Sequence, residues 1–108
     1  MDRYAAKLLF AYQIAGSSLN EGTTCEERII NFYASTSKSA LAIAQRQGAA
    51  AVYQFENSDG EQVVFQFVGI MDLLQLGIEC EANEVWYGVY EIDESPNLPN
   101  DEDLLSRC

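Results

Sequence analysis

One short segment decides what this chain can fold into. Residues 37–48, SKSALAIAQRQG, form the only run of helix-forming residues long enough for a helix of about three turns. The hydroxyl of Ser35, Thr36 or Ser37 can cap its first turn, and Gly48 can end it in the left-handed conformation. Because patterns typical of strands lie on both sides of it, this helix has to pack on a sheet.

The helix has a narrow apolar stripe. Ala40, Leu41 and Ala44 share one side at helical spacing, with Ile43 at its flank. A stripe made mostly of alanine buries little area by itself, so it needs a broad apolar surface beneath it. We therefore expect these residues to face the sheet.

Five segments show the alternation of apolar and polar residues that is typical of strands. They are residues 3–14, 25–34, 49–56, 61–70 and 84–93. Asn57-Ser58-Asp59-Gly60 predicts a tight hairpin turn, and a capping-box pattern predicts one helical turn at Asp72–Gln75, with Gly77 as its stop.

The predicted fold class is α+β. It is an antiparallel sheet of about five strands, in the order strand-strand-helix-strand-strand-strand, with one main helix packed on one face. Residues 1–93 are expected to form this single domain. Residues 94–108 are expected to form an acidic, flexible C-terminal tail, with at most a frayed helical turn at Asp101–Ser106.

Charge and composition exclude several classes of protein. The 108 residues carry 17 acids and 6 bases, a net charge of −11, which disfavours nucleic acid and anionic membranes as partners. No apolar run reaches the ~20 residues of a membrane span, and Lys7 and Gln13 interrupt the start that resembles a signal peptide. Three cysteines without a close pair favour a reducing cytoplasm, and nothing in the spacing supports a Cys25–Cys80 bridge.

The sequence names no catalytic, cofactor-binding or metal-binding residue. Without histidine, a Ser-His-Asp or Cys-His site cannot form. Glu26 and Glu27 fall on opposite faces of a strand, so we expect them to be solvated or paired with a basic side chain. A hard cation held by Glu79, Glu81, Glu84 and Asp72 is conceivable, but a solvated loop is the simpler interpretation. We predict no cofactor, and an enzymatic function, though still open, has no residues to support it.

The face opposite the helix still carries bulky residues, more than a solvated sheet face needs. This face is the predicted interaction surface, and a homodimer formed through it is the favoured explanation. Its residues are Ile29, Tyr33, Val64, Val68, Trp86 and Tyr90. Coverage by the tail, loops and long polar side chains is the alternative.

Several short motifs resemble a known family. They are RYAAKLLF at Arg3–Phe10, EERI at Glu26–Ile29, the segment Ala34–Gly48, FQFVGIMDL at Phe65–Leu73 and EVWY at Glu84–Tyr87. Together they resemble the small family called domain of unknown function 4288, over residues 3–93. The resemblance implies a stand-alone bacterial cytoplasmic domain, and it brings no activity and no catalytic residues.

We therefore predict a non-enzymatic protein-interaction or regulatory module that forms a homodimer. One alternative is an acidic inhibitor or immunity-type protein that binds a basic partner enzyme. Another is a small-ligand-binding domain that uses the aromatic strand at 84–93.

Overall fold

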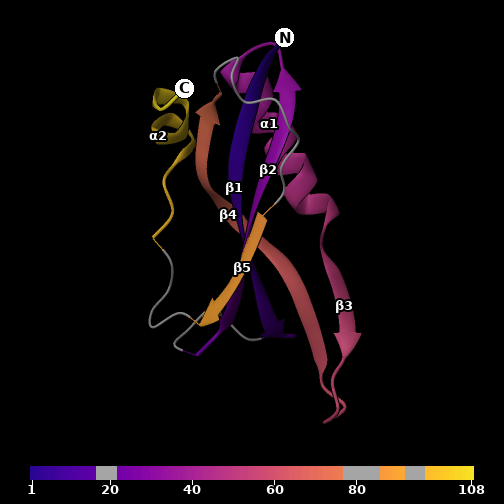
Figure 1. Ribbon diagram of the computed structural model, residues 1–108. Helices are drawn as coiled ribbons and strands as arrows, with labels where there is room; N and C mark the ends of the chain where they lie inside the picture. Colours follow the sequence, from indigo (N-terminus) through magenta and orange to yellow (C-terminus); the bar gives the residue numbers. More distant parts are fainter. Residues whose placement is uncertain (17–21, 77–85, 92–96) are drawn as a thin grey trace.

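The computed structural model describes residues 1–16, 22–76, 86–91 and 97–108 (Figure 1). Its elements are β1 (Asp2–Ile14), β2 (Thr24–Ala34), α1 (Ser37–Ala50), β3 (Tyr53–Glu56), β4 (Gln62–Gln75), β5 (Trp86–Glu91) and α2 (Asp101–Ser106). The strands form a sheet in the order β3-β4-β1-β2-β5, and each neighbouring pair is antiparallel. The predicted α+β class, with an antiparallel sheet and a main helix on one face, is confirmed.

The central strand, β1, is buried on both sides. Its even-numbered residues, such as Leu8 and Phe10, belong to the main core beneath α1. Its odd-numbered residues Leu9 and Ala11 form a second, smaller cluster with Cys25 on the opposite side. We call these two sides the α1 face and the far face of the sheet. Because β1 pairs with β2 and β4 and packs on both faces, it is the strand around which the fold is built.

Helix α1 packs as its apolar stripe predicts. Ala40, Leu41 and Ala44 are buried in the main core, and Ile43 packs at its edge. The cap is Thr36, whose side-chain oxygen accepts the backbone N–H of Ser39 at 3.1 Å.

The prediction that Gly48 ends this helix is wrong. The helix continues to Ala50, and its cap residue Ala51 stays right-handed, with φ −85°. Gly48 serves another purpose, because a Cβ there would lie 2.6 Å from the ring of Phe67 on β4. Since α1 runs on to Ala50, β3 begins only at Tyr53, later than the residue 49 predicted from its pattern.

The helical turn predicted at Asp72–Gln75 is also wrong. These residues extend β4, where Asp72 pairs with Lys7 and Leu73 pairs with Ala6 of β1. Backbone pairing of β4 with Tyr4–Ile14 of β1 and burial of Leu73 outweigh the local capping pattern. The ladder is irregular at two places, between Lys7 and Leu8 and between Leu9 and Phe10 of β1.

The predicted turn between β3 and β4 is confirmed. The Asn57 side-chain oxygen accepts the N–H groups of Asp59 and Glu61, at 3.0 and 2.9 Å. Gly60 has φ +80°, the conformation that the Asp-Gly pair supplies at low cost. The hairpin extends beyond the end of α1 in Figure 1, which leaves β3 without a helix over it.

The C-terminal segment, residues 97–108, packs along β4. Leu98 joins the cluster on the far face, whereas Leu104 of α2 is 2% exposed in the core of the α1 face. Arg107 Nη1 donates to Met71 O at 3.2 Å and to Asp72 Oδ1 at 3.0 Å. The helical turn expected at Asp101–Ser106 is present as α2, capped by Asn100. The division into a domain at 1–93 and a flexible tail stays a prediction.

The C-terminal segment protects an edge of the sheet that β3 leaves unpaired. Strand β3 pairs with β4 only from Gln62 to Phe65, so no strand among the described residues lies on the outer side of the remainder of β4, up to Gln75. Unpaired edges invite pairing with other chains unless something covers them. The C-terminal segment covers this part of β4. No helix in the described part of the chain is both long and apolar enough to cross a bilayer.

Candidate functional site

The surface predicted from the sequence lies on the far face. Ile29 and Val64 are half-buried there, and Tyr33 is 53% exposed. Val68 packs against the small cluster that Leu98 joins. The backbones of Trp86 and Tyr90 pair with Ile29 and Cys25, while their side chains lie outside the described part of the structure. The four residues whose side chains are described thus share one face, but among them only Tyr33 is exposed, and Leu98 packs on the cluster that holds Val68.

A second apolar surface lies on the other face of the sheet, the α1 face, around β3. All four residues of β3 are exposed. Four large apolar side chains lie there at 38–46% exposure, and we call them the β3 surface. They are Ile14, Val52, Tyr53 and Phe55.

Stacked rings hold the β3 surface in place. The ring of Phe65 is fully buried, and the rings of Phe10, Tyr12 and Tyr53 each lie 4.8 Å from it, centroid to centroid. The ring of Phe55 lies 6.1 Å from that of Tyr53. Rings packed at these distances have little freedom, so the exposed side chains are ordered before any partner arrives.

An ion pair lies on the same aromatic cluster. The guanidinium of Arg28 is 5.1 Å from the ring centroids of both Phe10 and Phe65. Its Nε lies 2.5 Å from Oε2 of Glu26, a buried carboxylate. Of the two states expected for Glu26, solvated or paired with a basic side chain, the structure shows the second, with Arg28 as the partner. The guanidinium and the carboxylate neutralise each other, so the ion pair orders the cluster and no unpaired carboxylate is left buried.

Burial also changes the acidity of a neighbouring phenol. Burial, followed by a hydrogen bond with Tyr53 and the negative charge of Glu26, raises the pKa of Tyr12 to about 12. This hydroxyl therefore keeps its proton to a higher pH than a free phenol does, and it acts as a hydrogen-bonding group. Together, these features make the site a rigid aromatic surface suited to binding.

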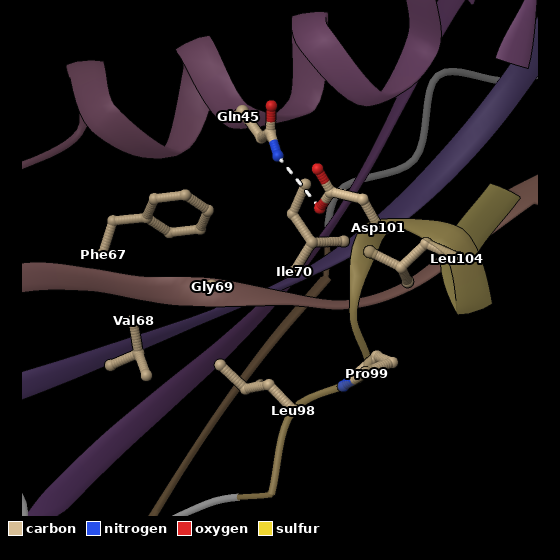
Figure 2. A pocket seen from close by; sticks show the side chains of 9 residues that line it. All are labelled: Gln45, Phe67, Val68, Gly69, Ile70, Leu98, Pro99, Asp101 and Leu104. Carbon is tan, nitrogen blue, oxygen red and sulfur yellow. Dashed lines mark hydrogen bonds between the residues drawn. The ribbon is translucent and has the colours of Figure 1, made fainter. Parts of the chain in front are cut away.

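A pocket of about 280 Å³ opens at the outer edge of β4 (Figure 2). In this view α1 and Phe67 lie on one side of the strand, whereas Val68 and Leu98 lie on the other, so the pocket reaches round the edge at Gly69. Its apolar lining also includes Ile70, Pro99 and Leu104. Two polar side chains meet at its rim, where Gln45 Nε2 lies 3.5 Å from Oδ1 of Asp101.

The glycine at the pocket is a spatial requirement. A Cβ at Gly69 would lie 2.6 Å from Cδ1 of Leu98. Any larger residue would push Leu98 away and fill the space between the C-terminal segment and β4. The pocket therefore depends on both the glycine and the docked segment.

Comparison with known proteins gives one result. The model of a family described as a domain of unknown function, DUF4288, matches residues 3–85. The chain belongs to the DUF4288 family. The match confirms the resemblance seen in the motifs and ends before β5, shorter than the expected 3–93. No curated protein matches the chain, and no solved structure matches it.

The described residues of this DUF4288 protein contain no group of three or more potential metal-ligating side chains. Of the hypothetical cation site, Glu79, Glu81 and Glu84 lie outside the described residues, and Asp72 is paired with Arg107 at 3.0 Å. Cys25 is free and buried, so it forms no bridge with Cys80.

Sequence reasoning missed both the β3 surface and the pocket. The alternation predicted a strand at residues 49–56, but it could not show that α1 stops short of Tyr53 and Phe55. The pocket had no signal at all, because its walls come from three segments that only the fold brings together.

Proposed function

We propose that this DUF4288 protein is a non-enzymatic protein-interaction module that forms a homodimer through β3. One observation carries the proposal: β3, an outer strand of the sheet, exposes all four of its residues and presents Tyr53 and Phe55 side by side on one face. An outer strand with exposed aromatic residues can accept a second strand, gaining both backbone hydrogen bonds and apolar contact. We place this module in the reducing bacterial cytoplasm, in agreement with the free thiols of Cys25 and Cys108.

The second strand is β3 of another copy, because the pleat makes this strand complementary to itself. In a two-fold symmetric antiparallel pair, residues directly opposite each other must lie on the same face of the joined sheet. Several registers of β3 meet this condition, and we propose the one in which Gln54 lies opposite Gln54 of the partner subunit, because both aromatic residues are then paired. Tyr53 then lies opposite the partner's Phe55, so four rings form one continuous apolar layer.

Charge does not oppose this pairing, although the chain is acidic overall. The one charged residue of β3, Glu56, lies at its end. In the proposed register it is four residues along the ladder from the partner's Glu56, roughly 13 Å at the rise of a strand. That separation exceeds the Debye length of about 8 Å at physiological salt, so their repulsion is largely screened.

The register can be tested by cross-linking. In a chain in which Cys80 and Cys108 are changed to serine, Gln54→Cys should give a disulfide-linked dimer under mild oxidation, because position 54 lies on the symmetry axis. Glu56→Cys is the matched control: it lies on the same strand and is also exposed, but its separation from the partner's position 56 is too large for a disulfide. Equal cross-linking of the two variants would contradict the register.

The dimer itself can be tested by sedimentation. We expect the unmodified chain to sediment at twice its 12.0 kDa mass at micromolar concentration. Phe55→Ser should weaken the dimer at least tenfold, since it removes an aromatic ring from each copy. The control is Leu74→Ser, with a comparable exposed fraction of 44% but on the far face at the other end of β4. A monomer at all concentrations would overturn the proposal, and an effect of Leu74→Ser alone would move the interface to the far face.

A further inference from the structure

We propose that the pocket at Gly69 binds a small apolar molecule that carries an ammonium group. This site is independent of the proposed dimer, since none of the residues that line it belongs to the β3 surface. Its volume of about 280 Å³ is just below the range of roughly 300–1,000 Å³ typical of drug-sized ligands, so it suits a smaller one.

The walls select the body of the ligand. The side chains of Phe67, Ile70 and Leu104 line the pocket on the α1 face, and Leu98 lines it from the far face. None of these groups can hydrogen-bond, whereas an apolar chain or ring placed among them is removed from water on several sides. The ligand therefore has an alkyl or aryl body.

The rim selects the head group. Among the described residues, Asp101 is the one charged side chain that lines the pocket, and no lysine or arginine of this part of the chain lines it. Glu102 and Asp103 follow in the same turn of α2, so the field at the rim is negative. A carboxylate or phosphate would be repelled there, and an ammonium would be attracted.

The existing partner of Asp101 is easily replaced. Gln45 Nε2 lies 3.5 Å from Oδ1 of Asp101, the far end of hydrogen-bonding range, and both residues are exposed. An ammonium N–H makes a shorter, charge-assisted bond to the same carboxylate. The oxygen of the Gln45 amide can then accept a second N–H from the ligand.

Two probes of similar size and opposite charge test the proposal on the full chain. Phenethylammonium should produce saturable shifts of the amide resonances of Gly69, Ile70 and Gln45, whereas phenylacetate should produce none at the same concentration. Asp101→Asn should weaken phenethylammonium binding about threefold to fivefold, the size expected for a charge pair at a partly exposed site.

Asp103→Asn is the matched control. It removes the same charge from the same turn of α2, but Asp103 does not line the pocket. We expect it to change binding less than twofold. Asn100 remains the cap in both variants, and a thermal melt shows whether α2 stays docked.

Three results would overturn the ligand site. They are the absence of saturable shifts, equal binding of phenylacetate, and equal loss in the two variants. The dimer is measured separately, by sedimentation. If the ligand site fails its test, the proposal of the dimer is unaffected, and if the dimer fails its test, the proposal of the ligand site is unaffected.

Discussion

At the scale of single residues, two glycines determine how closely the layers of this protein approach. Gly48 lets α1 lie directly on the ring of Phe67, and Gly69 lets Leu98 lie against the backbone of β4. Neither is one of the positive-φ glycines, which are Gly16, Gly22 and Gly60 among the described residues. The missing side chain, and not the backbone conformation, is what these two positions require.

Gly48→Ala should therefore destabilise the protein, although alanine is the better helix former. The gain in helix propensity is about 1 kcal/mol, whereas overpacking against a ring 2.6 Å away costs about 1–3 kcal/mol. We expect a net loss of about 1 kcal/mol in the free energy of unfolding, measured by urea denaturation. The double variant Gly48→Ala,Phe67→Leu has room for the methyl group. It should therefore lose less unfolding free energy than the single variant Phe67→Leu. A gain in stability for Gly48→Ala alone would show that α1 does not rest on Phe67.

At the scale of elements, tertiary pairing outweighs local sequence signals. Asp72-Leu-Leu-Gln has the pattern of a helix start, yet it continues β4 because Lys7 and Ala6 of β1 lie beside it. The carboxylate of Asp72 accepts the N–H of Leu73 at 2.9 Å and the guanidinium of Arg107 at 3.0 Å. The arginine comes from a segment that is distant in sequence, so no local pattern could have revealed this use of the carboxylate.

Helix α2 is too short to be stable by itself, so its side chains in the core must hold it. Leu104 is 2% exposed, and its truncation to alanine should cost about 2–4 kcal/mol of unfolding free energy. Leu105→Ala is the control on the same helix, at a residue that is only partly buried, and should cost less than half as much. Urea denaturation gives both values. Amide hydrogen exchange at Met71 and Leu73 should speed up in Leu104→Ala and not in the control. Equal costs for the two substitutions would argue that α2 is not anchored through Leu104.

At the scale of the whole molecule, acidity and burial act together at high pH. Burial raises the pKa of the Tyr4 hydroxyl and of the Cys25 and Cys108 thiols, and it is the main reason that the pKa of Tyr12 rises to about 12. All four groups keep their protons to higher pH in the folded chain than in the unfolded one. Any charge they gain adds to a chain that already carries −11.

Stability should therefore fall at alkaline pH. A raised pKa in the folded state means that the stabilisation is fully present below the unfolded pKa, about 9 for thiols and 10 for phenols. It is lost progressively as the pH rises to about 12, through the pKa of Tyr12. For each chain, the unfolding free energy at neutral pH serves as the baseline. Between about pH 10 and 12, Tyr12→Phe should lose less unfolding free energy than the unmodified chain. A stability that stays flat from about pH 8 to 11 would refute this linkage.

The sequence by itself determined the local structure and the layers of this protein. The alternation in β1 and β2, the alanine stripe of α1 and the Asn57–Gly60 turn each act between neighbours in the chain, so they can be read without the fold. Separately from these patterns, the short motifs between Arg3 and Tyr87 resemble the family whose match spans residues 3–85.

Only the tertiary structure decided the strand order and both candidate sites. The order β3-β4-β1-β2-β5 depends on which strands meet at a distance, and alternation carries no information about neighbours. The β3 surface is exposed because α1 ends before it covers Tyr53 and Phe55, and the pocket exists because α1, β4 and the C-terminal segment come together around Gly69. Burial and cavities are properties of surfaces that come together in three dimensions, and for that physical reason no single segment encodes them.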